Sequence, residues 1–294
     1  MSHVETELSS QPECWERSVE LSTEHRHLLG APGERLAVVG CGTSYFMAQA
    51  VACLREAAGL GETDAFAASE FPAGRRYDRV IALTRSGTTT EVLELLAHLR
   101  GSTRTTAITA DPDTPVKNAA DDLVVLAFAD EKSVVQTRFA TTAFTLLRAH
   151  LGLPTRKAIE DARTALAEPL PEGLAECTQF TFLGRGWSNG LAQEAALKMR
   201  EASLSWTEAY PAMEYRHGPI SISTVNTATW MFGSAPIGLA EQVEATGARW
   251  IEGRLDPLAE LVRAQRLAVR VAAARGLDPD RPRHLTRSVV LTTS

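Results

Sequence analysis

Two short segments of the chain combine hydroxyl side chains with glycine in a pattern that suits an anion. Residues 40–45 read GCGTSY and residues 84–91 read TRSGTTTE, and each segment follows a short apolar run and leads into a helical pattern. The first N–H groups of a helix lack intrahelical partners and carry partial positive charge, and Ser and Thr hydroxyls add donors. Two such segments after neighbouring strands favour a phosphate ester, although neither has the spacing of a nucleotide-binding loop. The alternative is that the hydroxyls only cap the helices.

Three charged residues, Glu194, Lys198 and Glu201, are spaced at i, i+4 and i+7. In a helix this spacing places all three on one face, where a carboxylate could move a proton and the ammonium could orient it. The alternative is a solvent-exposed ion pair, which stabilises a helix by only about 0.2–0.5 kcal/mol. The spacing alone favours the ion pair.

The elements that must position these residues follow from the hydrophobic pattern. In the first half, an N-terminal helix at 11–29 precedes strands at 36–39, 64–69, 80–83, 104–109 and 123–128 and helices at 44–58, 89–99 and 137–151. Alternating strands and helices indicate a parallel sheet covered on both faces, with ligands at the carboxyl ends of the strands. Both hydroxyl segments are expected at such ends.

The second half repeats this layout in a shorter form. Strands are expected at residues 180–183, 228–232 and 248–251, and helices at 189–204, 239–246 and 257–275. A polar, helical connector that contains Pro169 and Pro171 precedes the first of these strands and indicates a domain boundary. The expected division is therefore 1–155, with the N-terminal helix and the first domain, and 156–294, with a shortened second domain and the C-terminal tail.

Composition limits the classes of protein to which the chain can belong. With 294 residues, of which 44% are hydrophobic, the chain is long enough for two domains with packed cores. A net charge of −6 argues against nucleic acid or an anionic membrane surface as a partner, and no apolar run could span a bilayer. The four cysteines have no paired spacing and the first residues do not resemble a signal peptide, so we expect free thiols in the cytoplasm.

Several motifs resemble the sugar isomerase (SIS) domain family. Residues 41–44 (CGTS) and 86–89 (SGTT) look like the loops with which SIS domains hold the phosphate of a sugar phosphate. Residues 183–219 resemble the isomerase half of glucosamine-6-phosphate synthases, as does most of the chain, more loosely over 225–275. The resemblance implies an α/β fold of two SIS domains, each a flavodoxin-like, doubly wound parallel sheet flanked by helices. It also implies a homodimer with shared active sites.

The resemblance implies roles for the charged residues of the second half. In the synthases, the carboxylate that matches Glu201 moves a proton between C1 and C2 of the open-chain sugar, and the residue that matches Glu194 lies at the same site. Lys198 would orient a carboxylate or stabilise a developing oxyanion. The histidine that matches His217 opens the sugar ring and comes from the neighbouring subunit. The alternative for His217 is a turn residue before a Gly-Pro pair.

The resemblance also implies a set of phosphate- and sugar-binding residues with hydroxyl, glycine or cationic character: Gly42, Thr43, Ser44, Thr84, Arg85, Ser86, Gly87, Thr89, Thr137 and Arg287. Three residues depart from the synthases. Arg85 replaces a Gln, Thr88 replaces an acidic residue, and Arg287 replaces the Lys that reacts with the sugar carbonyl. Because Arg stays protonated it is a poor Schiff-base former, so Arg287 is expected to act as an electrostatic clamp.

Together these patterns predict a phosphosugar isomerase or an amino-sugar-6-phosphate deaminase, which would open the ring of a hexose or hexosamine 6-phosphate and transfer a proton between C1 and C2. The alternatives are a fructosamine-6-phosphate deglycase and a non-catalytic phosphosugar sensor. Neither a metal ion nor an organic cofactor is expected, since this proton transfer needs only a base and polar donors. Residue 2 is Ser and no glutaminase segment is recognised, so glutamine-dependent synthesis is not expected.

Overall fold

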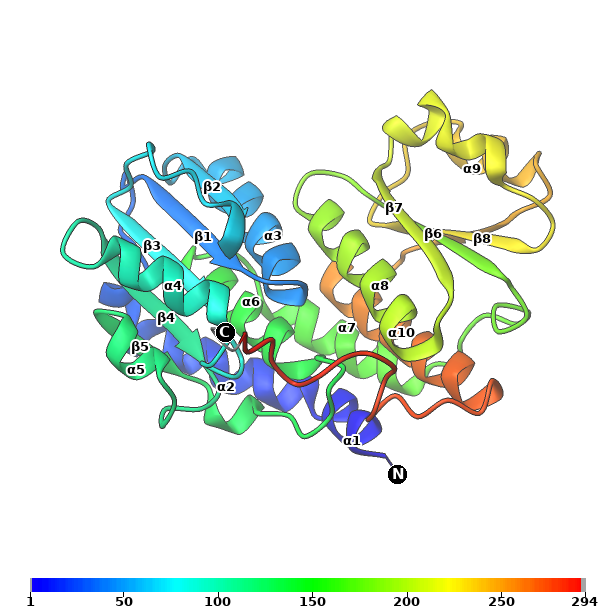
Figure 1. Ribbon diagram of the computed structural model, residues 1–294. Helices are drawn as coiled ribbons and strands as arrows, with labels where there is room; N and C mark the ends of the chain where they lie inside the picture. The colour runs from blue at the N-terminus through cyan, green and yellow to red at the C-terminus, as the bar shows by residue number, and fades with distance from the viewer. Residues whose placement is uncertain (1, 292–294) are drawn as a thin grey trace. The chain divides into compact units, whose positions relative to one another are not determined.

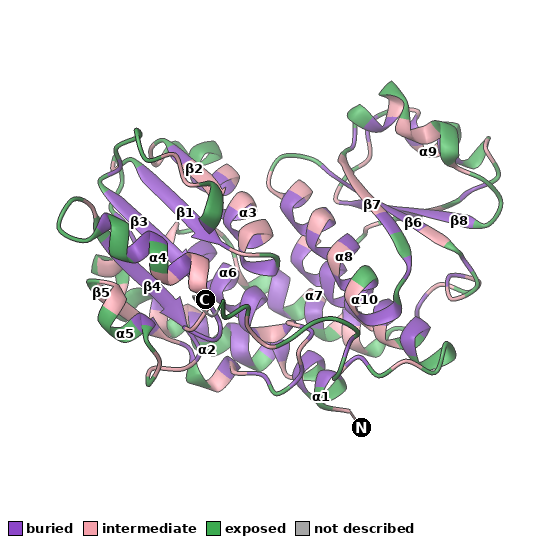
Figure 2. Cartoon of the chain, viewed as in Figure 1, coloured by how far each residue is buried: buried purple, intermediate pink, exposed green. Residues whose placement is uncertain are grey.

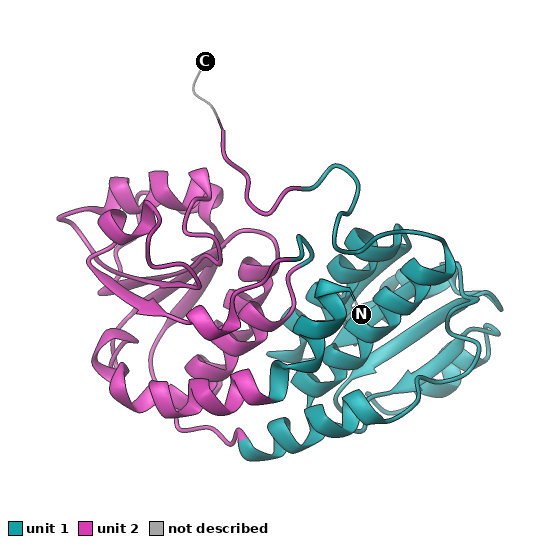
Figure 3. Ribbon diagram, turned by 90° about the horizontal axis from the view of Figure 1, so that it is seen from below, with its two compact units in different colours: residues 1–12, 133–135, 156–285 teal, residues 13–132, 136–155, 286–294 magenta. Residues whose placement is uncertain are grey.

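The structure, a computed structural model, describes residues 2–291 and divides into two compact units (Figures 1 and 3). Unit 2 contains residues 13–132, 136–155 and the tail from Thr286 onward; unit 1 contains residues 156–285, the segment 133–135 and the N-terminal residues up to Pro12. The expected boundary after residue 155 separates the bulk of the two units, but each terminal segment is grouped with the other half of the chain. The tail is therefore part of the unit that contains both hydroxyl segments.

Unit 2 is built on a five-stranded parallel sheet with the order β2-β1-β3-β4-β5, which is the doubly wound order of flavodoxin-like folds. Its strands are β1 (Leu36–Gly40), β2 (Thr63–Ala67), β3 (Arg79–Leu83), β4 (Arg104–Thr109) and β5 (Asp122–Val125). The expected α/β fold class is thus confirmed. The strand predicted at 123–128 ends at Val125, because its apolar run continues into a 3-10 helix, η3 (Ala127–Ala129), instead of pairing further.

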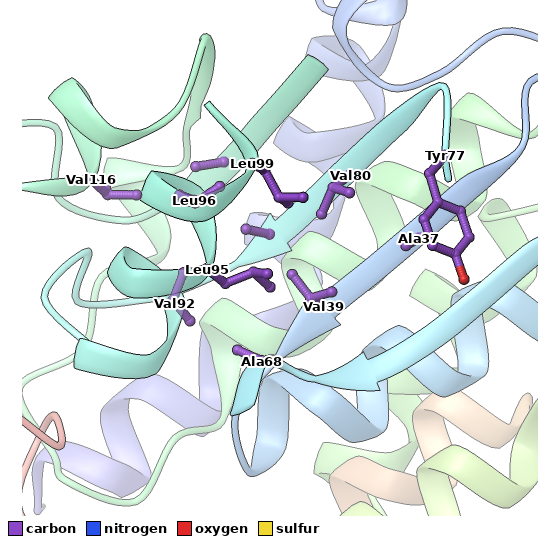
Figure 4. Close-up of a cluster of buried hydrophobic side chains, with 12 residues drawn as sticks. Ala37, Val39, Ala68, Tyr77, Val80, Val92, Leu95, Leu96, Leu99 and Val116 are labelled. Carbon is purple, nitrogen blue, oxygen red and sulfur yellow. The ribbon is translucent and has the colours of Figure 1, made fainter. Parts of the chain in front are cut away.

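The helices of unit 2 bury apolar faces against this sheet and against each other. They include α3 (Thr43–Ala57), α4 (Thr90–Leu99), α5 (Val116–Ala119) and α6 (Arg138–His150). The buried side chains of α4 recur at helical spacing, from Val92 to Leu99, and pack with Val39 of β1 and Val80 of β3 (Figure 4). Strands β1 and β3 are buried along their whole length (Figure 2), which explains why they read as continuous apolar runs.

Unit 1 contains a four-stranded parallel sheet with the order β7-β6-β8-β9. Its strands are β6 (Gln179–Gly184), β7 (Trp206–Pro211), β8 (Thr227–Phe232) and β9 (Arg249–Glu252). Its helices are α1 (His3–Ser9), α7 (Arg156–Ala167), α8 (Ser188–Ser203), α9 (Leu239–Glu244) and α10 (Pro257–Ala274). The strand order repeats that of the first four strands of unit 2, so the two halves share one layout.

Strand β7 is an element that the sequence pattern did not predict. It lies at the edge of the sheet, where three of its six residues are half-buried and two are exposed, and polar residues such as Glu208 interrupt its apolar pattern. The end of α8 is also not marked by a glycine in the sequence. Leu204 takes the left-handed conformation that glycine usually adopts at this position, with φ of 55°. The helix predicted at 11–29 also divides, into α2 (Gln11–Glu24) and the 3-10 turn η1 (Arg26–Leu28).

Candidate active site

The second hydroxyl segment forms the turn between β3 and α4, and only glycine fits at its centre. Gly87 has a φ of 63°, and a Cβ atom there would lie 2.0 Å from Thr114 Oγ1 and 2.8 Å from Val116 Cγ1. The turn therefore requires glycine both for its backbone conformation and for its close approach to the next loop. This geometry fixes residues 84–89 at the carboxyl end of β3, where the sequence predicted a ligand site.

Hydroxyl groups from the turn and from the C-terminal tail come together here. Thr88 Oγ1 lies 3.0 Å from Ser86 Oγ, and these two oxygens lie 2.9 and 3.1 Å from Ser288 Oγ. Thr89 Oγ1 lies 3.4 Å from the same Ser288 oxygen. The predicted residues Ser86 and Thr89 thus share one cluster. The sequence analysis missed Ser288, although a hydroxyl beside the candidate Arg287 was a usable signal.

Helix capping does not account for the hydroxyls of this turn. Thr89 occupies the N-cap position of α4, but its side chain makes no capping hydrogen bond. Thr84 Oγ1 is buried and has no hydrogen-bond partner in the part of the chain that the structure describes. Because a buried polar group without a partner costs roughly 1–3 kcal/mol, this hydroxyl is better explained as a donor to a ligand oxygen. The turn therefore favours the anion-binding interpretation over capping.

The first hydroxyl segment follows β1 and opens α3. Gly42 is the N-cap of the helix, and Thr43 and Ser44 are its first residues, each 5% exposed. Burial, together with the Glu91 carboxylate, raises the pKa of the Cys41 thiol to about 11. Cys41 is therefore protonated at neutral pH and is no nucleophile. The segment thus places two buried hydroxyl groups at the carboxyl end of β1, whereas the N–H groups of Ser44 and Tyr45 already donate to the carbonyl oxygens of Cys41 and Gly42, at 3.1 and 3.0 Å. Its role as a binding loop stays a prediction.

Arg85 lies between a buried acid and the tail. Its Nη1 is 3.6 Å from Glu131 Oε2, and its Nη2 donates to the carbonyl oxygen of Arg287 at 2.9 Å. Glu131 is 1% exposed, and its Oε1 accepts hydrogen bonds from Thr137 Oγ1 at 2.8 Å and from the Thr137 N–H at 2.6 Å. The Thr137 hydroxyl is therefore bound to the Glu131 carboxylate. The sequence analysis did not identify Glu131, whose signal was an acidic pair, Asp130 and Glu131, just after the last strand of the sheet.

Arg287 is held by acceptors of the same unit. Its guanidinium forms an ion pair with Asp130 Oδ1 and donates to the carbonyl oxygen of Glu131. The side chain is 36% exposed. These contacts fasten the tail near the hydroxyl turn, and the role of Arg287 as a clamp on the sugar stays a prediction.

The charged residues of the second half form a buried cluster on α8. Lys198 Nζ lies 3.5 Å from Glu194 Oε1 and forms an ion pair with Glu201 Oε2. The side chains of Glu194 and Lys198 are each 1% exposed, and that of Glu201 is 19% exposed. The solvent-exposed ion pair that the spacing favoured is therefore wrong. Because burying ions costs several kcal/mol each, such a cluster is typical of a functional site.

Glu201 is the member of this cluster that lines a cavity. The cavity lies within unit 1, has a volume of about 220 Å³, and is also lined by Leu204, Leu277, Arg281 and Arg283. Neighbouring contacts fix α8: Arg200 donates to the carbonyl oxygen and to Oγ1 of Thr207 in β7, both at 3.1 Å. The carboxylate of Glu201 is thus placed on a rigid helix and remains partly open to a ligand.

His217 lies on a different element, the 3-10 helix η4 (Glu214–His217), and is exposed. Its neighbour Arg216 anchors this helix by donating to Gln242 Oε1 and to the carbonyl oxygen of Ile237, both at 2.6 Å. An exposed histidine on an anchored turn is accessible to a second subunit. Its predicted role in ring opening stays a prediction.

The described residues contain neither a cluster of metal ligands nor a helix that could span a membrane. Among residues 2–291, no group of three His, Cys, Asp or Glu side chains is placed to hold a metal ion. Within the same range, none of the helices is both long enough and apolar enough to cross a membrane. The four cysteines, Cys14, Cys41, Cys53 and Cys177, are free thiols.

Relatives of known sequence match most of the chain. A glutamine–fructose-6-phosphate aminotransferase of Methanothermobacter thermautotrophicus is 28% identical over 312 residues, which cover 88% of this chain and 52% of the relative. The corresponding aminotransferase of Gloeobacter violaceus is 29% identical over 319 residues, with the same coverages of 88% and 52%. The chain thus spans about half the length of the relatives it matches.

Solved structures and a family match complete the comparison. A glucosamine-6-phosphate deaminase from Thermotoga maritima is 27% identical, with a TM-score of 0.82 over 99% of this chain and 100% of that one. A tagatose-6-phosphate ketose/aldose isomerase from Escherichia coli has a TM-score of 0.83 over 99% and 96% of the two chains, and at 19% identity it shows the shared fold alone. Residues 31–151, which contain both hydroxyl segments, match the family described as the SIS domain. The first half of the chain therefore contains a SIS domain.

Proposed function

We propose that the chain is a phosphosugar enzyme that opens the ring of a hexose or hexosamine 6-phosphate and moves a proton between C1 and C2. With a plain sugar phosphate the reaction is an aldose–ketose isomerisation. With an amino sugar, water releases the nitrogen as ammonia and leaves a ketose 6-phosphate. The observation that carries the proposal is the buried cluster of Glu194, Lys198 and Glu201, whose outermost carboxylate lines a cavity.

In this proposal the hydroxyl segments of unit 2 bind the phosphate. Ser86, Thr89 and the buried Thr84 hydroxyl donate to phosphate oxygens, as do Thr43 and Ser44 at the start of α3. Hydrogen bonds to a charged group are stronger than those between neutral groups, and the start of a helix favours an anion. Gly42 and Gly87 let the backbone approach the phosphate closely.

The proton transfer is assigned to the cluster on α8. Glu201 takes the proton from one of the two carbons and returns it to the other, passing through an enediol, or an enaminol when the substrate is an amino sugar. Lys198 holds the carboxylate in position through its ion pair. Glu194, 3.5 Å from the same ammonium, helps to orient it. This assignment needs no group beyond the side chains named.

Ring opening is assigned to His217, supplied by the second subunit of a homodimer. A histidine can both donate and accept a proton near neutral pH, which ring opening requires. The support for a second subunit is that His217 is exposed on η4 rather than buried with the carboxylates of α8. Thr137 is retained as a residue near the sugar.

A panel of substrates tests the proposal. Purified protein is given glucosamine 6-phosphate, glucose 6-phosphate and fructosamine 6-phosphates, and the formation of ketose or aldose phosphates and the release of ammonia or amine are measured. We expect turnover of a hexose or hexosamine 6-phosphate. Turnover of fructosamine 6-phosphates alone would instead identify a deglycase. Saturable binding without turnover of any of them would contradict an enzyme and leave a phosphosugar sensor.

A further inference from the structure

The C-terminal tail of the chain uses the donors that the proposed function assigns to phosphate. Ser288 Oγ lies 3.1 Å from Ser86 Oγ, 2.9 Å from Thr88 Oγ1 and 3.4 Å from Thr89 Oγ1. One residue further, the carbonyl oxygen of Val289 accepts the N–H of Thr90 at 3.1 Å. Thr90 is the first residue of α4, so this carbonyl occupies a helix-start donor as well.

Additional contacts fasten the same segment, residues 286–291, to unit 2. Arg287 binds Asp130 and the carbonyl oxygen of Glu131 through its side chain. Its own carbonyl oxygen accepts from Arg85, and the N–H of Leu291 donates to Thr90 Oγ1 at 2.8 Å. The tail is thus a strap with anchors on both sides of Ser288.

We propose that Ser288 occupies the phosphate-binding turn in the resting protein and that a sugar phosphate must displace it, so that the tail and the substrate compete for the same donors. The proposal rests on the proposed function, because it takes residues 84–89 as the phosphate loop. A single oxygen surrounded by three hydroxyl groups has the surroundings of one phosphate oxygen. Each hydroxyl has one proton, so it cannot donate to Ser288 and to phosphate at once.

Competition has a quantitative consequence for affinity. When only a fraction of the molecules has an open site, the apparent Kd equals the intrinsic Kd divided by that fraction. The strap is held by neutral hydrogen bonds at the turn, whereas a phosphate dianion makes stronger, charge-assisted ones, so phosphate wins at sufficient concentration. By the same linkage, bound phosphate releases the strap.

Binding measurements on variants of the whole 294-residue chain test the sign of this coupling. Ser288→Ala removes the oxygen that occupies the turn, and Val290→Ala is the matched control in the same strap, since that side chain is 62% exposed. Calorimetry with glucosamine 6-phosphate and with inorganic phosphate should show about two- to tenfold tighter binding to Ser288→Ala, the range of one hydrogen bond, and no change for Val290→Ala. Weaker or unchanged binding to Ser288→Ala would overturn the proposal. Weaker binding would show instead that Ser288 is a phosphate ligand.

Release of the strap provides a second readout that does not depend on activity. Trypsin cleaves after Arg287 in the strap and after Arg283, which precedes it, and mass spectrometry gives the ratio of the two cuts. We expect inorganic phosphate or sugar phosphate to raise cleavage after Arg287 relative to Arg283, and Asp130→Asn to raise it without ligand. Protection of Arg287 by phosphate would contradict competition. Failure of wild type and Ser288→Ala alike to bind any phosphate would refute the phosphate loop itself, and with it both proposals.

Discussion

Each unit has a serine-containing turn at the carboxyl end of a strand, after β3 in unit 2 and after β6 in unit 1, and the two turns use their hydroxyl groups differently. In unit 1, Ser188 follows β6; its Oγ accepts from the Arg185 N–H at 2.9 Å and donates to the carbonyl oxygen of Phe232 at 2.8 Å. That hydroxyl is fully used by the fold. In unit 2, the turn after β3 keeps a buried Thr84 hydroxyl without a partner among the described residues, and its Ser86 contacts only neighbouring hydroxyl groups and a backbone N–H. The Ser188 hydroxyl therefore serves the fold of unit 1, whereas the turn after β3 contains a buried hydroxyl that the fold of unit 2 does not use.

The helices that follow the strands differ in the opposite sense. Helix α4 of unit 2 buries only apolar residues, as its packing on β1 and β3 requires. Helix α8 of unit 1 buries Glu194 and Lys198 at 1% exposure. A buried ion pair is rarely more stable than an apolar pair of the same size, so stability does not explain these charges. The proposed function accordingly assigns the anion to unit 2 and the acid–base chemistry to unit 1.

The largest test of this division is to remove the base from α8. Glu201→Gln keeps the size of the side chain but not its proton affinity, and we expect kcat to fall by about 100- to 10,000-fold, the usual range for a general base. Binding of an unreactive sugar phosphate should survive, because the phosphate donors lie in unit 2. A loss of binding equal to the loss of kcat would contradict the division.

Mixing subunits extends this test to His217. If His217→Ala is equally inactive and His217 acts on the neighbouring subunit, random exchange with Glu201→Gln subunits should restore about a quarter of the sites, because one site of each mixed dimer then carries neither defect. If the two residues serve the same subunit, every site keeps a defect and activity does not return. Native mass spectrometry checks that mixed dimers form.

A second test measures how the buried charges of α8 affect the free energy of unfolding. Lys198→Met leaves the buried Glu194 carboxylate without this cation, and we expect unfolding in urea to show a loss of about 3–5 kcal/mol. Arg156→Ala is the matched control, because Arg156 and Glu160 form an i, i+4 pair with side chains 92% and 57% exposed. That change should cost no more than about 0.5 kcal/mol. Equal losses would show that the α8 cluster is energetically an ordinary surface pair.

The Arg156–Glu160 and Glu194–Lys198 pairs also show that charge spacing in the sequence does not predict burial. The charge spacing at 156 and 160 is the same as at 194 and 198, yet one pair is exposed and the other buried. Burial depends on which elements pack against a helix face, and spacing within one helix carries no such information. The family resemblance, rather than the spacing, pointed to the charges of α8 as a site.

Local signals were sufficient for the hydroxyl segments and for the parallel order of the strands. A glycine turn after a buried strand is visible in a few consecutive residues, and alternating strands and helices fix a doubly wound sheet. The contact of Ser288 with Ser86 joins residues 202 positions apart, and Glu131 meets Arg85 only because both lie at the end of the sheet. Such pairs depend on the folded chain, so the sequence alone did not predict them.

A third test concerns the thiol beside the first hydroxyl segment. A pKa of about 11 instead of 9.0 leaves Cys41 with about 100-fold less thiolate at pH 8 than a thiol of ordinary pKa. We expect its alkylation by iodoacetamide, followed by mass spectrometry, to be slower by about that factor and to accelerate tenfold per pH unit up to about pH 11. Glu91→Gln should raise the rate only in part, because burial is the larger cause. Rapid alkylation at neutral pH would indicate a reactive cysteine and not a binding loop.

The smallest expected effect is also the most direct comparison of the two turns. Ser86→Ala in unit 2 should weaken the binding of a sugar phosphate by about 1–2 kcal/mol, the size of a hydrogen bond to a charged group, without a matching loss of stability. Ser188→Ala in unit 1 should do the reverse: it leaves the Phe232 carbonyl without its donor and lowers stability by about 1 kcal/mol, while affinity for the sugar phosphate stays unchanged. Because the Ser86 hydroxyl also bonds to Ser288, Ser86→Ala loosens the strap, and the easier displacement of the strap offsets part of the lost phosphate affinity.

The affinity measurement is therefore repeated in the Ser288→Ala background, where Ser86→Ala should show its full loss of phosphate affinity. If both serine variants change only stability, or if wild type binds the sugar as tightly as its phosphate, the two turns are equivalent joints and the anion site of unit 2 is refuted.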